Sequence, residues 1–369
     1  MGDDGALDLA ALARRQPLIF SDSELAELLA RAETSAGARK LLSAHFAETG
    51  EIEQAFAHAH AGFALDREPE AAANVMRLYY RVARFDEALA FAETENAWFD
   101  PIELALFLTM IHWREGRDEL SRQFGRAALE QKAATARSVT AEPATPIRRE
   151  GAKILSFSLF GDAPRYLEGA LRNAVVARHL YPGWRARFYV DATVPGVAIN
   201  RLSAEGAEII VIAEDDPLAG FGRLWRFLVE DDPSVSLYAV RDCDAVINIK
   251  ERAAVEDWLN SGKTAHIMRD HPVHAELILA GMWGARAGAL KSMRNRILEF
   301  LKAYPADHGD THVDQQFLRN EVWPVIHRDA LTHDDWFAFG DCQPFRQELS
   351  LPPFRHIGQD DSVIRASDL

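Results

Sequence analysis

The spacing of hydrophobic residues changes along this chain, and the change separates two kinds of region. Up to about residue 134 the chain is rich in alanine, and its apolar residues recur at helical spacing. Beyond residue 150, short apolar runs of strand length alternate with helical segments. The strands are expected at 153–160, 185–190, 208–212 and 235–240, with a helix at 165–179. This alternation predicts an α/β domain with a mainly parallel sheet that is covered on both faces.

The helical region repeats itself at a step of about 33 residues, close to the ~34 of the tetratricopeptide repeat. In each unit apolar and aromatic residues pack the first helix, and a Gly or Ala makes the turn into the second. The third unit is degenerate, because Asp118 stands where an apolar residue is expected. A helical bundle with accidental spacing is the alternative. The aligned positions are Leu42, Ser43, Phe46, Gly50, Ile52 and Ala55; Val75, Met76, Tyr79, Ala83, Phe85 and Ala88; and Leu108, Thr109, His112, Gly116, Asp118 and Ser121.

A stretch without apolar periodicity follows the helices. Residues 132–149 include Pro143 and Pro146 among several threonines and serines, a composition typical of a linker. We therefore predict an all-α, tetratricopeptide-like domain over residues 1–134, a linker over 135–150 and an α/β domain over 151–369.

Composition and charge exclude several classes of function. The 369 residues are 48% hydrophobic and 26% charged, as in a soluble globular protein. A net charge of −15 argues against a duplex nucleic-acid binder, which needs a basic face. No apolar stretch approaches the ~20 residues that span a bilayer, and the N-terminus is acidic. The two cysteines, Cys243 and Cys342, form no disulfide framework, so a cytoplasmic location is expected.

The segment Arg241-Asp242-Cys243-Asp244 directly follows the apolar run at 235–240. Two carboxylates just past the carboxyl end of a strand can turn toward the crevice where open α/β sheets bind ligands. Hard cations such as Mg²⁺ and Mn²⁺ prefer such oxygen ligands and often share them with substrate phosphates. The alternative is that the Asp pair only forms a turn or caps a helix.

This segment resembles the D-x-D motif of GT-A-fold glycosyltransferases, in which a metal joins the protein to a nucleotide-sugar diphosphate. Further along the chain, three segments resemble parts of family 8 of these enzymes. They are the Gly-containing strand on the acceptor side, the Asp-Gln segment beside the donor sugar and the C-terminal His-x-x-Gly-type segment. Their counterparts here are Leu279-Ala280-Gly281-Met282-Trp283-Gly284, His312-Val313-Asp314-Gln315-Gln316-Phe317-Leu318 and Arg355-His356-Ile357-Gly358-Gln359. In the last one the spacing is His-x-Gly, and no Lys-Pro-Trp follows.

The resemblance implies a GT-A-like fold over about residues 153–359 and a set of site residues. Asp242, Asp244 and His356 would hold Mn²⁺ or Mg²⁺, and the donor would be a UDP- or GDP-sugar. Asp314 or Gln315 would lie close to the reacting carbon, with retention of configuration. The alternative for His356 is a surface histidine, and for the Asp314 segment an acidic helix start.

Donor contacts are expected from arginines near the motif. The segment 220–227 resembles the basic helix that precedes the motif strand in these enzymes, and its Arg223 would bind phosphate. Arg226 of the same segment is the second candidate for this contact. The alternative for the segment is an amphipathic helix whose arginines are solvated. Arg241 would contact the donor or only neutralise the neighbouring carboxylates.

Two further contacts are expected from position alone, and one from an aromatic side chain. Ser158, at the end of the first strand, and Asp191, at the end of the second, would bind the nucleotide. Trp283 offers either an apolar surface for sugar stacking or a core side chain.

The segment 266–274 is unusually rich in polar side chains. Asp270 or His271 would help to position the donor sugar or the acceptor, and a turn capped by these side chains is the alternative. A metal cluster of Asp270, His271 and His274 is disfavoured, because Pro272 fits poorly in the helix on which His-x-x-His converges.

The sequence therefore predicts a metal-dependent glycosyltransferase that acts on a protein or glycan acceptor, with the repeats as a possible protein-binding surface. One rival is another nucleotide-sugar enzyme, but the segment 158–162 lacks the basic Gly-rich loop of a nucleotidyltransferase. The other rival is a catalytically inactive domain that serves as a scaffold through its repeats.

Overall fold

The computed structural model describes residues 8–13, 15, 17–136, 147–304, 312–352 and 355–360. The chain forms two compact units, residues 1–128 and 129–369, which are considered separately below. The linker predicted over residues 135–150 falls largely on 137–146, which lie outside the described residues.

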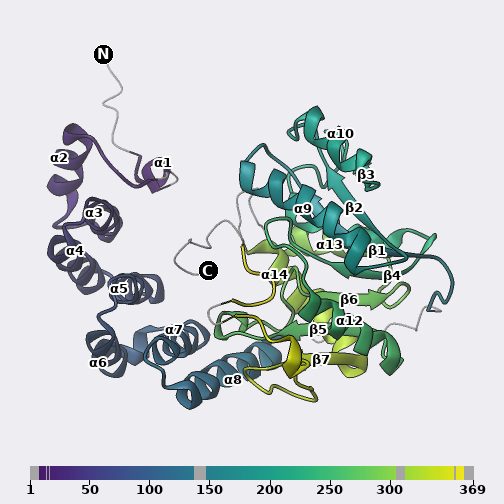
Figure 1. The fold of residues 1–369 in the computed structure, drawn as a ribbon. Coiled ribbons are helices and arrows are strands. Elements are labelled where there is room, and N and C mark those ends of the chain that lie inside the picture. Colours follow the sequence, from purple (N-terminus) through teal and green to yellow (C-terminus); the bar gives the residue numbers. More distant parts are fainter. Residues whose placement is uncertain are drawn as a thin grey trace. The chain divides into compact units, whose positions relative to one another are not determined.

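The first unit consists of helices, most of them in consecutive pairs (Figure 1). The first helices of three pairs begin at residues 36, 69 and 101, and the second helices begin at 52, 85 and 118. These starts reproduce the predicted step of about 33 residues. The helices are α1 (Leu9–Ala13), α2 (Asp22–Arg31), α3 (Ala36–Thr49), α4 (Ile52–Leu65), α5 (Pro69–Arg81), α6 (Phe85–Glu95), α7 (Pro101–Arg114) and α8 (Asp118–Thr135).

The predicted turn positions end the first helix of each pair in the same way. Gly50, Ala83 and Gly116 all adopt left-handed backbone, with φ of 85°, 57° and 70°. This conformation ends a helix and is easy for glycine but strained for alanine. The aligned apolar positions Leu42 and Val75 are fully buried in the core of the unit. The prediction of an N-terminal region of repeated helix pairs is confirmed.

The second unit is built on a seven-stranded sheet with the order β3-β2-β1-β4-β6-β5-β7 (Figure 1). The strands from β3 to β4 are parallel, as are β5 and β7, whereas β6 is antiparallel to both of its neighbours. The predicted mainly parallel sheet is therefore confirmed, with one reversed strand that the sequence pattern did not indicate. The strands are β1 (Ala152–Leu159), β2 (Trp184–Val190), β3 (Glu208–Val211), β4 (Val235–Val240), β5 (Ala265–Arg269), β6 (Trp283–Arg286) and β7 (Ala330–Asp334).

Apolar side chains cover both faces of the sheet. Along β1, Leu155 and Phe157 join one core with helices α9 and α12, while Ile154 joins the other core with α11 and α13. This alternation follows from the two-residue period of a strand. The helices of this unit are α9 (Pro164–Leu180), α10 (Gly196–Ala204), α11 (Gly222–Trp225), α12 (Ile249–Ser261), α13 (Met293–Ala303), α14 (Val313–Phe317) and α15 (Trp323–Ile326).

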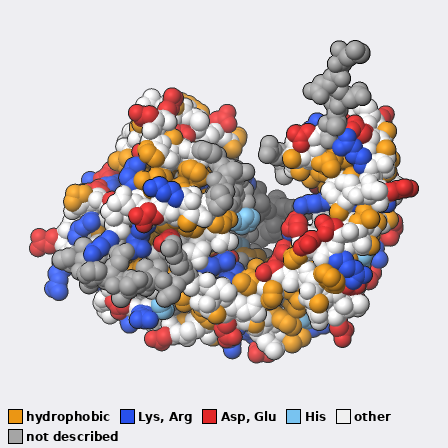
Figure 2. All heavy atoms as spheres, turned by 180° about the vertical axis from the view of Figure 1, so that it is seen from behind, with side chains coloured by type: hydrophobic (Ala, Val, Ile, Leu, Met, Phe, Trp, Pro, Cys, Tyr) orange, Lys and Arg blue, Asp and Glu red, His pale blue; other side chains and the backbone are white. Residues whose placement is uncertain are grey.

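Parallel strands place their carboxyl ends at one edge of the sheet, so the segments after β1, β2 and β4 meet there. This topology brings residues that are 80 or more positions apart in the chain to a single edge. Among the described residues, we find no helix with the length and apolar character that spanning a lipid bilayer requires. Acidic and basic side chains are interspersed on the face seen in Figure 2, in keeping with an acidic protein that has no dominant basic surface there.

Candidate functional site

The two aspartates of the Asp-x-Asp segment lie at the carboxyl end of β4 and line a cavity of about 190 Å³. Three of the other predicted site residues, Ser158, Arg223 and Asp314, line the same cavity. The structure thus brings together side chains from the ends of β1 and β4 and from α11 and α14. The remaining lining residues are Leu159, Phe160, Tyr166, Arg226 and Cys243.

A buried arginine joins two of these carboxylates. Arg226 pairs through Nη1 with Asp242 Oδ1 and through Nη2, at 2.8 Å, with Asp314 Oδ2. Its backbone is held by β1, because Ser158 Oγ accepts from Arg226 N at 2.9 Å and Ser156 Oγ donates to Arg226 O at 2.6 Å. Burial raises the pKa of Asp314 although Arg226 opposes the shift. Arg226 therefore fixes the position of both acids.

Two glycines allow other segments to approach the Asp-x-Asp segment closely. A Cβ at Gly281 would lie 2.0 Å from Asp242 Oδ2, and a Cβ at Gly169 would lie 2.1 Å from the Cys243 carbonyl oxygen. Both distances are far below van der Waals contact, so any larger residue would displace the motif. Gly281 belongs to the segment that the sequence analysis assigned to the acceptor side, and here it touches the first aspartate.

Asp244 lies among other carboxylates. Burial, together with the negative charges of Asp242 and Asp360, raises the pKa of Asp244 to about 6, while Arg165 opposes the shift. Arg165 also pairs with Asp360 at 3.3 Å. Carboxylates gathered at a cavity edge offer the oxygen ligands that Mg²⁺ or Mn²⁺ prefers, and a cation would relieve their repulsion. The donor set of Asp242 and Asp244 therefore fits the predicted metal.

A second cavity, of about 290 Å³, adjoins the first and shares Phe160 and Arg223 with it. Asp191 lines this cavity and is held in place by Thr193, whose hydroxyl and amide both donate to Asp191 Oδ1. The rest of the lining is mostly apolar or glycine and includes Phe221 and Trp225. The predicted contacts Asp191 and Arg223 therefore lie at one continuous surface with the acidic pair.

Two predicted donor contacts lie instead in the protein core. Arg241 is 1% exposed and pairs with Glu251 at 2.8 Å. Trp283 is fully buried in β6 and packs against Tyr238 and Phe227. Both positions favour the structural alternatives, a neutralised buried arginine and a core tryptophan, because neither side chain lines the two cavities.

Asp270 and His356, predicted for the acceptor side and the metal, lie together in a different place. Asp270 follows β5, and its Oδ2 accepts from Lys250 Nζ at 2.8 Å and from Ile357 N at 3.2 Å. His356 contacts the rings of His271 and His274. Among the described residues, none of its contacts is with Asp242 or Asp244.

Gln315, the other residue predicted near the reacting carbon, follows Asp314 in α14. The backbone N–H of Gln315 donates to Asp314 Oδ1 at 2.8 Å. The side-chain Oε1 is buried without a hydrogen-bond partner among the described residues. Gln315 does not line either cavity.

Two residues have a larger role at this site than the sequence predicted. Arg226 was only the second candidate of the segment 220–227 for a donor contact, yet it joins both acids. Asp360 was not considered, although it directly follows the C-terminal segment that carries His356 and Gly358. Its acidity next to that segment is the signal that could have identified it.

The chain was compared with protein-family models and with curated proteins, and nothing matches in either set. Among solved structures, a mutant O-GlcNAc transferase from Thermobaculum terrenum is similar with 15% sequence identity and a TM-score of 0.37. The similarity covers 63% of this chain and 45% of that chain, so the match spans less than half of the known structure. A similarity this weak assigns neither a fold family nor an activity.

Proposed function

We propose that the second unit is a glycosyltransferase that moves a sugar from a nucleotide-sugar donor to a protein or glycan acceptor. The observation that carries the proposal is the position of Asp242 and Asp244 beside two joined cavities at the carboxyl edge of the sheet. Open α/β sheets bind nucleotides at such an edge. The reversed strand β6 and the Asp-x-Asp segment after the central strand β4 also support a GT-A-like domain.

The larger cavity suits the nucleoside of the donor. Its aromatic side chains, Phe160, Phe221 and Trp225, offer an apolar surface, and Asp191 offers a carboxylate that can accept from ribose hydroxyls. Arg223 lies between this cavity and the acidic one, where a diphosphate would pass. Its planar guanidinium can bind two phosphate oxygens at once.

Asp242 and Asp244 would hold a divalent cation in the smaller cavity. A cation there neutralises the charge that develops on a departing diphosphate. Arg226 keeps Asp242 and Asp314 in place, so that the acids do not move apart when the donor enters. Asp314 stands at the opposite side of the Arg226 guanidinium from Asp242, close to where the donor sugar would lie.

The helical unit would recognise the acceptor or a protein partner. Its repeated pairs resemble tetratricopeptide repeats in their step and turn positions, and stacked helix pairs present extended surfaces for binding.

The test is metal-dependent hydrolysis of UDP- and GDP-sugars by the full chain, with Asp242→Asn and Asp244→Asn as variants. Because a ligand of the metal is lost, we expect each to lower the rate by about 10²-fold or more. Asp215→Asn is the matched control, since Asp215 is an exposed aspartate of the same unit. A variant that combines Asp242→Asn with Asp244→Asn, folds normally and hydrolyses the donor at the wild-type rate would overturn the proposal.

A further inference from the structure

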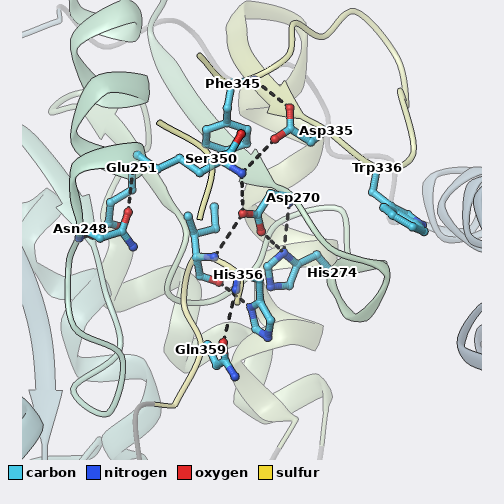
Figure 3. Close-up of polar contacts among 12 residues, drawn as sticks. Asn248, Glu251, Asp270, His274, Asp335, Trp336, Phe345, Ser350, His356 and Gln359 are labelled. Atoms are coloured by element: carbon cyan, nitrogen blue, oxygen red, sulfur yellow. Dashed lines mark hydrogen bonds and ion pairs between the residues drawn. The ribbon is translucent and has the colours of Figure 1, made fainter. Parts of the chain in front are cut away.

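Three side chains that can bind a metal converge away from the Asp242 and Asp244 pair. Asp270, His274 and His356 each offer a ligand atom, and these atoms all lie within 4.8 Å of one another. They come from the end of β5, from the short helix η3 (Pro272–His274) and from the C-terminal segment 355–360. Figure 3 shows the three side chains turned toward a common point.

One oxygen of Asp270 is buried and lacks a partner. The side chain is 2% exposed, and Oδ2 is satisfied by Lys250 Nζ and by the amide of Ile357. Oδ1 has no hydrogen-bond partner among the described residues, although His274 Nδ1 lies 3.2 Å away. Leaving a buried carboxylate oxygen unpaired is costly, so this atom calls for a cation or a proton.

The nitrogen beside this oxygen acts as an acceptor. His274 Nδ1 lies 3.2 Å from Asp270 Oδ1 and accepts from the backbone amide of Asp270 at 3.2 Å, so its single lone pair would have to turn from that amide to bind a cation. Two acceptors at this distance repel each other unless a positive charge lies between them. Tetrahedral coordination at about 2.1 Å separates ligand atoms by about 3.4 Å, which matches this pair.

His356 supplies a second imidazole in a suitable form. Its Nδ1 lies 2.8 Å from the carbonyl oxygen of Ile357 and donates to it, which leaves the lone pair on Nε2. Metal-binding histidines commonly donate their other N–H to a backbone carbonyl in this way.

The local charge also favours a cation. Lys250 pairs with both Asp270 and Asp335, at 2.8 and 2.9 Å, so one positive charge faces two negative charges. Figure 3 shows Asp335 on the far side of Asp270 from the two histidines. The group of Lys250, Asp270 and Asp335 is therefore negatively charged overall, and Asp270 is its member next to the two histidines.

We propose that Asp270, His274 and His356 bind a divalent transition metal of the Zn²⁺ type, at a site separate from Asp242 and Asp244. Two imidazoles and one carboxylate suit such an ion better than Mg²⁺, which prefers oxygen ligands alone. The prediction that His356 shares a metal with Asp242 and Asp244 is replaced here by a second centre. Pro272 does not prevent this arrangement, because the third ligand comes from the C-terminal segment and not from a helix with His-x-x-His spacing.

The ion would fasten the C-terminal segment to the end of β5. Ile357 is fully buried and Gly358 adopts φ of 69° against Met282, so this segment is already packed there. Asp360 follows within the same segment and acts on the charge state of Asp244. The new site would therefore help to hold Asp360 in place near Asp244.

The experiment is calorimetric titration of the metal-free full chain with Zn²⁺. We expect one tightly bound ion per chain, whose affinity is unchanged in the variant that combines Asp242→Asn and Asp244→Asn. Combining His274→Ala with His356→Ala should weaken binding by about 100-fold or more, because two ligands are lost. His327→Ala is the matched control, since His327 is a half-buried histidine stacked on Trp323 elsewhere in the same unit.

Melting temperatures separate loss of the site from loss of the fold. Zn²⁺ should raise the melting temperature of the wild type and of His327→Ala but not that of the double histidine variant. If that variant does not fold, calorimetric titration of His356→Gln tests the site instead. Anomalous scattering at the zinc edge on wild-type crystals then locates the ion. Absent Zn²⁺ binding in the wild type, or an ion located away from these three residues, would overturn the proposal.

Discussion

The buried guanidinium of Arg226 lies 2.8 Å from the carboxylate of Asp314, a residue 88 positions further along the chain. The same guanidinium pairs with Asp242, the first aspartate of the Asp-x-Asp segment. One arginine therefore connects the end of β4 with the start of α14. The geometry of the acidic cavity depends on a residue that need not touch the substrate.

Removing this arginine should destabilise the protein strongly. We expect Arg226→Ala to lower the free energy of unfolding by about 3–5 kcal/mol, because the buried carboxylate of Asp314 and the partly exposed one of Asp242 lose their partner. Urea denaturation measures the change. The control is Arg223→Ala, three residues earlier and half-buried, which should weaken donor binding with little loss of stability. Equal stability losses in the two variants would contradict the assigned role of Arg226.

The left-handed turns of the helical unit give a prediction about backbone strain. Ala83 adopts φ of 57° where the equivalent positions carry Gly50 and Gly116. We expect Ala83→Gly to stabilise the unit by about 0.5–1 kcal/mol, because glycine relieves the strain.

Gly50→Ala and Gly116→Ala are the matched reverse changes. An added Cβ at either position meets no atom within 4 Å, so any loss measured by thermal or urea unfolding reports backbone strain alone. We expect each to cost about 1 kcal/mol. A destabilising Ala83→Gly would show that the turn is not strained.

Glu230 should make stability depend on pH. This carboxyl group is fully buried in η2 (Arg226–Asp231), and its Oε1 accepts from the amides of Gly288 and Leu290. Burial raises the pKa of Glu230 to about 7, although these hydrogen bonds oppose the shift. The folded state therefore binds a proton more tightly than the unfolded state, in which the pKa is about 4.3. The stability that the protonated form contributes is present below about pH 4 and is lost as pH rises through 7.

The variant Glu230→Gln tests this dependence, because glutamine keeps the accepting oxygen without the charge. We expect it to be more stable than the wild type by about 2–3 kcal/mol at pH 8.5 and similar in stability at pH 4.5. Urea denaturation at the two pH values measures the difference. A difference that does not change with pH would show that Glu230 is ionised in the folded state.

An apolar groove in the helical unit is a candidate acceptor surface. Tyr80, Phe107 and Met110 help to line a cavity of about 270 Å³ between α5 and α7. We expect the pair of changes Leu106→Glu and Met110→Glu to reduce transfer to a protein acceptor by about tenfold, because the charges oppose burial of an apolar partner. Hydrolysis of the donor should be unchanged.

The control for the groove is Leu65→Glu, at an exposed leucine of the same unit outside this cavity. Both activities should be retained in that variant. Loss of donor hydrolysis in the groove variant would indicate a general defect and would contradict a role confined to the acceptor.

Local patterns were sufficient for much of the architecture. The step of about 33 residues located the helix pairs and their turns, because helical spacing and left-handed turn residues are properties of short segments. The strands at 153–160 and 235–240 were found within one residue of β1 and β4. The Asp-x-Asp segment was correctly placed at a carboxyl strand end, since that position depends only on where the apolar run stops.

The partners of each polar side chain, in contrast, were decided by tertiary structure. Arg241 and Asp242 are adjacent in the sequence, yet one turns into the core toward Glu251 and the other lines the cavity. Neighbouring residues after a strand point to opposite sides, and only the packing of α12 and η2 determines which side is buried. The grouping of Asp270 with His356 likewise requires the C-terminal segment to return across 86 positions to β5. Such contacts depend on the packed sheet and its connections, which no local spacing along the chain specifies.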